Sequence, residues 1–342
     1  MEAGDLRALL DQAPGLTVLV AGDFFLDKYL DIDARLSEPS LETGLEAYQV
    51  AGVRCYPGAA GTVVSNLRAL GVNVIALGVI GEDGEGSDLR RGLSAIGVDG
   101  ASLITTSGRF TPTYLKPMLR LAEGGVPARE LNRFDTKNRS PLPVEIETEV
   151  IARLRGLLPR VQGVVISDQV SEPSCGLVTG RVRAVLGELA RAYPAVTFVA
   201  DSRERIGEFR DVIVKPNALE ALRAAGLADA DLPTAGRELH RRTGRPVVLT
   251  HGDQGMLVFD QDGEHRVPAI PVTGPIDVVG AGDSAMAGLI TALCAGASTP
   301  EAALVGNLCA SITIQQLGVT GTATPAQVLA RFEEAYANPV RS

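Results

Sequence analysis

Apolar runs and helical patterns alternate along nearly the whole chain. Each apolar run is rich in Val, Ile or Leu and ends near a Gly, Asp, Asn or Ser. The runs cover residues 16–23, 73–81, 163–168, 196–202, 211–217 and 246–252. Because their apolar positions are continuous and do not alternate with polar ones, we expect strands buried on both faces, as in a parallel sheet.

Segments with a helical spacing of apolar residues lie between these runs. The predicted helices cover residues 62–70, 86–96, 145–157, 178–192, 218–225, 234–243, 283–295 and 300–316. A short amphipathic helix is also expected at the Leu-rich N-terminus. This alternation is typical of an α/β fold with a doubly wound, mostly parallel sheet flanked by helices. In such folds ligands bind at the carboxyl ends of the strands, so polar residues there are the first candidates for a site.

Two segments interrupt the alternation, residues 28–56 and residues 110–136. Both favour antiparallel strands, and the second contains a Gly124-Gly125 turn between two extended runs. Strands inserted at the ligand-binding edge predict a small antiparallel β lid, or a clasp that pairs two copies into a homodimer. We find no low-complexity linker and no internal repeat, and we expect residues 1–342 to form a single domain that includes this lid.

Composition and charge narrow the range of partners. The 342 residues carry a net charge of −9 and no Lys/Arg-rich run, which argues against a nucleic-acid partner. No segment approaches the ~18 apolar residues that span a bilayer, and the N-terminus does not resemble a leader, so we expect no membrane partner. The four cysteines are widely spaced and do not combine with the three histidines at metal-site spacing. We therefore expect reduced thiols in a cytoplasmic protein.

The sequence DVVGAGDSAMAGL, residues 277–289, places a carboxylate at the start of a predicted helix. Gly280, Ala281 and Gly282 allow a tight turn whose N–H groups can form an anion hole. Asp283 could then accept a proton from a hydroxyl while those N–H groups stabilise a phosphoryl group in transfer. The alternative is that Asp283 only caps its helix.

Two further turns follow predicted strands. In VKPNALE, residues 214–220, Asn217 and Glu220 lie one helical turn apart, and their oxygens suit a hydrated Mg2+. The alternative is an ordinary helix start with an Asx turn. In LTHGDQG, residues 249–255, the Thr250 hydroxyl and the N–H groups around Gly252 could meet a triphosphate. The alternative there is a simple hairpin turn.

Near the N-terminus, VAGDFFLD places Asp23 and Asp27 at the end of the first predicted strand. Paired carboxylates at this position can bind neighbouring sugar hydroxyls. The glycine-rich segment YPGAAGTVVSNLRALG, residues 56–71, opens another helix. Each feature has a structural alternative, because Asp27 could cap a turn and the glycines could serve close packing alone.

Taken in this order, the motifs resemble those of the ribokinase/PfkB carbohydrate kinases, over roughly residues 16–330. The resemblance implies a ribokinase-like fold and ATP-dependent transfer of a phosphoryl group to a sugar hydroxyl. It implies Asp283 as the base, residues 280–282 as the anion hole, and Asn217 with Glu220 as the residues that organise Mg2+. By the same resemblance, Thr250, Gly252 and Gly255 lie along the nucleotide. Asp277 fits the family's monovalent-cation loop, which makes K+ a candidate cofactor.

Within the family, the segments GDFFLDKY, PTYLK, ELNRFD, VVISD and GVTGTATP resemble the heptose-phosphate kinase branch of the ADP-heptose pathway. This resemblance implies a sugar or sugar-phosphate acceptor, with a heptose 7-phosphate favoured. It suggests Asp27, Lys116, Arg133 and Asp168 as residues around the acceptor. A phosphorylated acceptor would explain a Lys and an Arg on the lid, which could otherwise be exposed strand charges.

The first glycine-rich signature departs from the family pattern. Ala59 follows Gly58 where a second glycine is usual, and Thr62 stands where an asparagine that touches the sugar is expected. The acceptor pocket is therefore expected to differ in shape and hydrogen bonding. These departures leave two alternatives open: a kinase for another sugar or a nucleoside, and a non-catalytic regulator that binds sugar or nucleotide. An NAD-dependent enzyme is disfavoured, because GDFFLD replaces the GxGxxG expected after the first strand.

Overall fold

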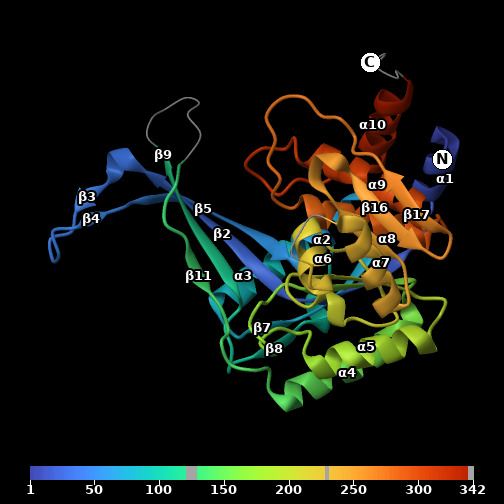
Figure 1. Cartoon of the computed structure of the whole chain (residues 1–342). Helices are drawn as coiled ribbons and strands as arrows, with labels where there is room; N and C mark the ends of the chain where they lie inside the picture. Colours follow the sequence, from blue (N-terminus) through green and yellow to red (C-terminus); the bar gives the residue numbers. More distant parts are fainter. Residues whose placement is uncertain (121–128, 228–230, 338–342) are drawn as a thin grey trace.

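The computed structural model describes residues 1–120, 129–227 and 231–337. Its centre is an eight-stranded sheet with the strand order β17-β16-β15-β14-β13-β12-β1-β6 (Figure 1). These strands are β1 (Thr17–Gly22), β6 (Asn73–Leu77), β12 (Gly163–Asp168), β13 (Thr197–Ser202), β14 (Ile213–Val214), β15 (Val247–Thr250), β16 (Met256–Asp260) and β17 (Gly263–Val267). The strands from β6 to β15 pair in parallel, and β16 and β17 add an antiparallel edge. The mostly parallel sheet expected from the sequence is confirmed.

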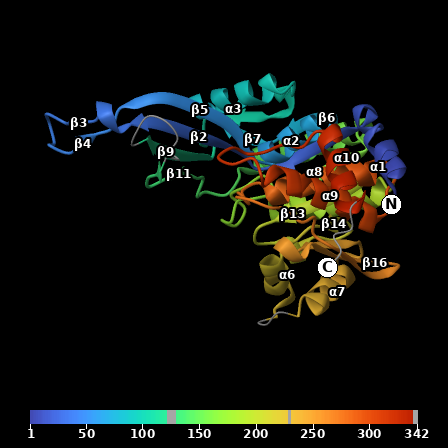
Figure 2. The same ribbon diagram turned by 90° about the horizontal axis from the view of Figure 1, so that it is seen from above.

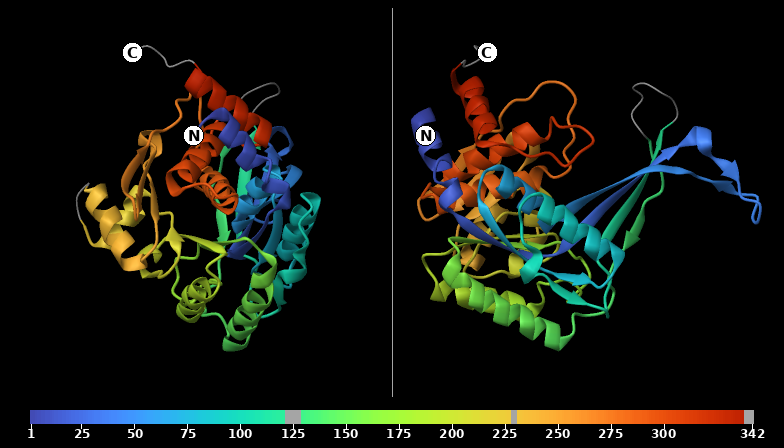
Figure 3. Two further views of the ribbon diagram at one scale, coloured as in Figure 1. Left: turned by 90° about the vertical axis from the view of Figure 1, so that its right-hand side faces the viewer. Right: turned by 180° about the vertical axis from the view of Figure 1, so that it is seen from behind.

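Helices cover both faces of this sheet. One face packs against α1 (Ala3–Leu10), α2 (Ala60–Ala69), α8 (Ala281–Cys294), α9 (Thr299–Thr313) and α10 (Pro325–Ala337). The other packs against α4 (Val144–Leu157), α5 (Gly180–Ala192), α6 (Ala218–Ala225) and α7 (Leu232–Thr243). Figure 3 shows the red and green helices on opposite sides of the sheet. Along β1, Val18 and Val20 join the first core while Leu19 and Ala21 join the second, because successive side chains of a strand point to opposite faces.

A second sheet projects from the body as an arm, which we call the lid (Figures 1 and 2). It contains β2 (Phe24–Asp33), β5 (Val50–Ala59), β9 (Thr113–Arg120), β10 (Arg129–Glu130) and β11 (Phe134–Thr136), with β3 (Glu38–Pro39) and β4 (Glu46–Ala47) at its tip. Near the body, α3 (Gly84–Ala95) packs against β2 and β5. The predicted strands are present, but β2 and β9 pair in parallel. The small antiparallel lid expected from the sequence is confirmed apart from this one parallel pair, which arises because the chain passes through α2 and α3 before β9 and returns to the lid from its base. The predicted Gly124-Gly125 turn lies outside the described residues.

Two predicted strands are shorter than expected. The run 73–81 divides into β6 and β7 (Val79–Gly81), and β7 pairs with β8 (Ile104–Thr106) outside the main sheet. The run 211–217 is reduced to the two residues of β14. Among the described residues, no helix is both long and apolar enough to cross a membrane.

Helices α8 and α9 lie unusually close together. A Cβ atom on Gly288 of α8 would lie 2.9 Å from the Val305 carbonyl oxygen, and one on Gly306 of α9 would lie 2.9 Å from the Ala285 carbonyl oxygen. Any larger side chain at either position would push the two backbones apart.

Candidate active site

The glycine turn before α8 brings Asp283 to the end of the sheet where the parallel strands finish. Gly280 caps the helix with a left-handed backbone, φ 79°, which glycine adopts without steric cost. Asp283 is the third residue of α8 and the acidic residue of its first turn. Gly280, and not Asp283, therefore occupies the N-cap position of α8.

Asp283 faces a pocket of about 270 Å3 built from the carboxyl ends of four strands. The lining residues are Gln169, Asp201, Arg203, Lys215, Asn217, Glu220, Thr250, Gly280, Gly282 and Asp283. Gln169 follows β12, Asp201 and Arg203 lie at the end of β13, and Lys215 follows β14. This is the edge at which ligands bind in open α/β sheets.

Sequence reasoning singled out neither the two cations of this pocket nor Gln169 and Asp201. Lys215 lies inside VKPNALE, but that motif was interpreted only through Asn217 and Glu220. Gln169, Asp201 and Arg203 belong to no motif considered above, and their only signal was position at or just after the carboxyl end of a predicted strand. Lys215 is 3% exposed, and its Nζ lies 2.8 Å from Asp201 Oδ2. Burial alone would lower the pKa of Lys215, but the charges of Asp201, Glu220 and Asp283 outweigh it and raise that pKa. Lys215 is therefore a fixed positive charge beside the glycine turn.

The electrostatics of the pocket prepare Asp283 to exchange a proton near neutral pH. Burial, and next the charge of Asp201, raise the pKa of Asp283 to about 7, while Lys215 and Arg203 oppose the shift. A carboxylate tuned in this way suits a general base, because its pKa lies near the working pH.

Asn217 and Glu220 start α6 and also line the pocket. Asn217 Oδ1 accepts the Glu220 N–H at 2.9 Å, and Glu220 Oε2 accepts the Asn217 N–H at 2.8 Å. This is a capping box, so the ordinary helix start weighed above is present, and it leaves Glu220 Oε1 without a role in the cap. Burial, followed by the charge of Asp201, raises the pKa of Glu220.

The oxygen donors of this corner fit a hydrated Mg2+. In the described part of the chain, no cluster of three or more His, Cys, Asp or Glu is arranged to hold a metal. Magnesium usually keeps several waters and needs only one or two carboxylates, so Glu220 with Asn217 is an adequate donor set. Thr250 lines the same pocket and its hydroxyl donates to the Pro216 carbonyl at 3.4 Å. Gly252 and Gly255 form the turn that follows it, outside the pocket lining.

On the lid side, Asp27 lies near enough to Asp283 for its charge to raise the pKa of that residue. Asp27 Oδ1 lies 2.8 Å from Lys116 Nζ, which also donates to the Tyr29 hydroxyl at 3.2 Å. Gly58 lies directly against Asp27, since a Cβ atom there would be 2.4 Å from Asp27 Oδ2. The structure thus brings Asp27, Gly58 and Lys116 together at the base of the lid.

Other candidate residues have partners away from the pocket. Arg133 Nε pairs with Asp135 Oδ1 at 2.6 Å, and its guanidinium lies 4.3 Å from the centre of the Tyr114 ring. In the exposed loop before α8, Asp277 Oδ1 accepts the Val279 N–H at 3.0 Å.

The two departures from the family signature lie in and just before α2. Thr62 is 4% exposed, and its Cγ2 would lie 3.5 Å from a Cβ atom on Gly280, so it packs behind the glycine turn. Ala59 adopts φ 52°, a backbone conformation that favours glycine.

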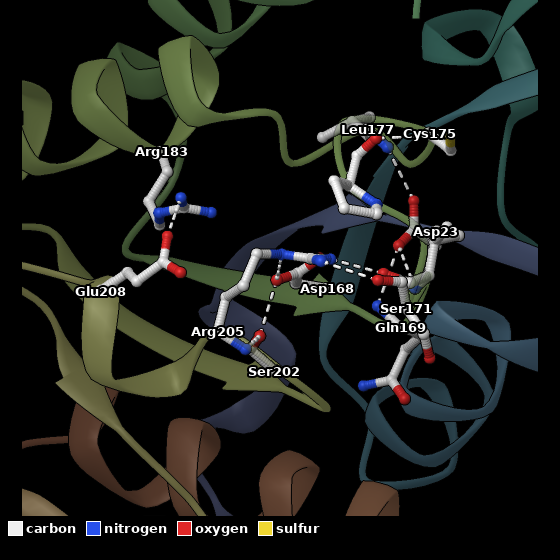
Figure 4. A network of polar contacts seen from close by, with 12 residues as sticks. Asp23, Asp168, Gln169, Ser171, Cys175, Leu177, Arg183, Ser202, Arg205 and Glu208 are labelled. Carbon is white, nitrogen blue, oxygen red and sulfur yellow. Dashed lines mark hydrogen bonds and ion pairs between the residues drawn. The ribbon is translucent and has the colours of Figure 1, made fainter. Parts of the chain in front are cut away.

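Two buried carboxylates next to the pocket serve the fold (Figure 4). Asp168 is fully buried, with Arg205 Nη2 at 2.7 Å and the Ser202 hydroxyl at 2.6 Å. Asp23 accepts backbone N–H groups of Leu177, Gln169 and Val170 at 2.7, 2.8 and 3.0 Å. Burial, and next the charge of Asp168, raise the pKa of Asp23 to about 6. Asp23 therefore holds the loop that carries Gln169, and Asp168 holds Arg205, whose guanidinium donates to the Ser171 and Val170 carbonyls of the same loop.

This architecture is that of the ribokinase-like kinases, and comparisons with known proteins agree. Arabidopsis thaliana ribokinase in complex with ribose and ATP superposes with a TM-score of 0.64 at 18% identity, covering 93% of this chain and 99% of that one. Such distant likeness concerns the fold alone. A family model described as pfkB family carbohydrate kinase matches residues 203–327.

Curated relatives that this chain matches carry the name bifunctional protein HldE. The protein from Hyphomonas neptunium is 31% identical over 345 residues, which cover 98% of this chain and 67% of that protein. The one from Geotalea uraniireducens is 29% identical over 348 residues, with the same two coverages. The chain thus spans about two thirds of the length of the curated relatives it matches. It belongs to the pfkB family of carbohydrate kinases, which are phosphotransferases with an alcohol group as acceptor.

Proposed function

We propose that this protein transfers the γ-phosphoryl group of ATP to a hydroxyl of a sugar or sugar phosphate. One observation carries the proposal. Asp283, with a pKa near 7, lies in the first turn of α8 and shares a pocket with the glycine turn and the buried cation of Lys215. A base, an anion hole and a fixed positive charge are the groups that phosphoryl transfer requires.

In this reaction Asp283 takes the proton of the acceptor hydroxyl while the oxygen of that hydroxyl forms the new bond to the γ-phosphorus. The bond between that phosphorus and the β–γ bridging oxygen breaks, and ADP leaves with the electron pair. N–H groups of residues 280–282 and Lys215 stabilise the charge on the transferring group. Glu220 and Asn217 would hold a hydrated Mg2+, which would supply neutralisation of phosphate charge. Thr250, Gly252 and Gly255 would lie along the nucleotide, and the loop at Asp277 would hold a monovalent cation such as K+.

For the acceptor we propose a phosphorylated sugar resembling a heptose 7-phosphate. Asp27, beside Gly58, accepts a hydrogen bond from a sugar hydroxyl, and Lys116 and Arg133 turn from their carboxylate partners toward the acceptor phosphate. Support comes from the proximity of Asp27 to Asp283 and from the ion pair between Asp27 and Lys116. Ala59 and Thr62 shape the wall behind this site, and Asp168 acts through the loop it holds. We further propose that the lid pairs two copies into a homodimer.

An ADP-release assay over heptose 7-phosphates, other sugar phosphates, free sugars and nucleosides tests the function. We expect turnover that depends on ATP and is highest with a phosphorylated sugar. Highest turnover with a nucleoside or a free sugar would reject the acceptor proposed here and keep the kinase. Ligand binding by calorimetry without turnover on any acceptor would reject the kinase and favour a non-catalytic regulator.

A further inference from the structure

Arg203 is a cation that lines the pocket without an acidic partner. It follows β13 directly and is exposed, and it makes no ion pair among the described residues. Its one side-chain hydrogen bond runs from Nη2 to the neutral Gln169 Oε1 at 3.4 Å. Its backbone N–H donates to the Asp168 carbonyl at 3.1 Å, so its main chain is fixed while its guanidinium is only weakly held.

Carboxylates at or near the ends of the neighbouring strands have partners other than Arg203. Asp168 is bound by Arg205 and Ser202, and Asp23 is bound by three backbone N–H groups, as Figure 4 shows. Asp201 pairs with Lys215, and Glu204 pairs with Arg223 at 2.8 Å. Arg203 forms no ion pair with these carboxylates, and it shares the pocket with Asp283 and Glu220, which its charge affects without an ion pair.

The charge of Arg203 acts both on the proposed base, Asp283, and on the proposed metal-binding residue, Glu220. It lowers the pKa of Asp283 and also that of Glu220, although burial dominates both groups and raises them overall. Lys215 is different, because it is buried and held by Asp201. The pocket thus contains one fixed cation and one that can move.

We propose that Arg203 is a catalytic residue of the transfer, a step that rests on the proposed function. Its guanidinium leaves Gln169 and binds oxygens of the γ-phosphoryl group while that group passes to the acceptor hydroxyl. A planar guanidinium can offer two parallel N–H donors to a phosphoryl group, which an ammonium cannot. Lys215 stays with Asp201 throughout, so the two cations have separate tasks.

Steady-state kinetics of three variants test the role of Arg203. In Arg203→Ala we expect kcat to fall by about 10²-fold or more, with the KM for ATP changed less than about threefold. In Arg203→Lys the charge returns without the paired donors, so only part of the loss should be recovered. Arg237→Ala is the matched control, because Arg237 is an exposed arginine paired with Glu264 away from the pocket. A kcat of Arg203→Ala within twofold of wild type would overturn the proposal.

Binding and pH measurements separate a catalytic role from a structural one. By calorimetry, Arg203→Ala should weaken the binding of ADP with aluminium fluoride, a mimic of the transferring group, at least about tenfold more than the binding of a non-hydrolysable ATP analogue. The acid limb of kcat should also move to higher pH, since a charge that lowers the pKa of Asp283 is gone. Equal losses for both ligands would reject the role. Absence of turnover in the wild type would count against the proposed function, and the binding comparison would still test Arg203.

Discussion

At the scale of single residues, the pKa of Asp283 sets the pH range in which this residue can act as a base. The base must be ionised to accept a proton, and its pKa is about 7. Activity should therefore be lost as the pH falls through about 7 and should be constant above it. Asp283→Asn should lower kcat by about 10²-fold or more and leave ATP binding near the wild-type value. Rates across pH 5–9 and calorimetry with an ATP analogue check both statements, and near wild-type turnover in the variant would exclude Asp283 as the base.

Ala59 stores backbone strain at the entrance to α2. At φ 52° an alanine side chain is unfavourable, and glycine at this position relieves the clash. We expect Ala59→Gly to increase the free energy of unfolding by about 1 kcal/mol, measured by urea denaturation. Ala60→Gly, one residue later and inside α2, should decrease it by a similar amount. Equal destabilisation by both substitutions would contradict the assignment of strain to Ala59.

At the scale of elements, the start of α6 combines a helix cap with a donor set for a metal. Glu220→Gln keeps the capping box, because a glutamine oxygen also accepts the Asn217 N–H, but it removes the carboxylate charge. We expect the Mg2+ concentration for half-maximal activity to rise about tenfold, measured by titration at saturating ATP. Glu301→Gln is the matched control, since Glu301 occupies the same place in the capping box of α9. An unchanged titration for Glu220→Gln would exclude the metal role.

Elements with a strong local pattern could be predicted from the sequence. The buried Val and Ile runs and the glycine turn at residues 280–282 located β1, β12, β13, β15 and the start of α8. The pairing of β2 with β9 could not, because it depends on the path of a long connection. The roles of Lys215 and Arg203 could not be predicted either, because the role of a cation depends on its neighbours in space. One is bound by Asp201 and the other is left without a carboxylate, and no local spacing records that difference.

At the scale of the whole molecule, the lid extends far from the body and carries apolar side chains at its tip. Leu41 and Leu45 are among the most exposed large hydrophobic residues described. A second copy would cover such residues, so we expect a dimer of about twice 35.8 kDa in sedimentation at micromolar concentration. Leu45→Glu should shift it toward monomer. Val144→Glu, an equally conspicuous apolar position on the body, should not, and a monomeric wild type would refute the lid interface.

The close packing of α8 against α9 contributes to the position of Asp283. Gly288 lies five residues after the aspartate, and Gly306 lies on a different helix. Both glycines allow α8 and α9 to pack closely, and this packing fixes the position of α8 with Asp283 in its first turn. The glycine turn at residues 280–282 therefore does not fix the position of α8 alone, because the contact with α9 at Gly288 and Gly306 also fixes it. The position of Asp283 therefore depends on Gly288 within DVVGAGDSAMAGL and also on Gly306, which lies outside that motif.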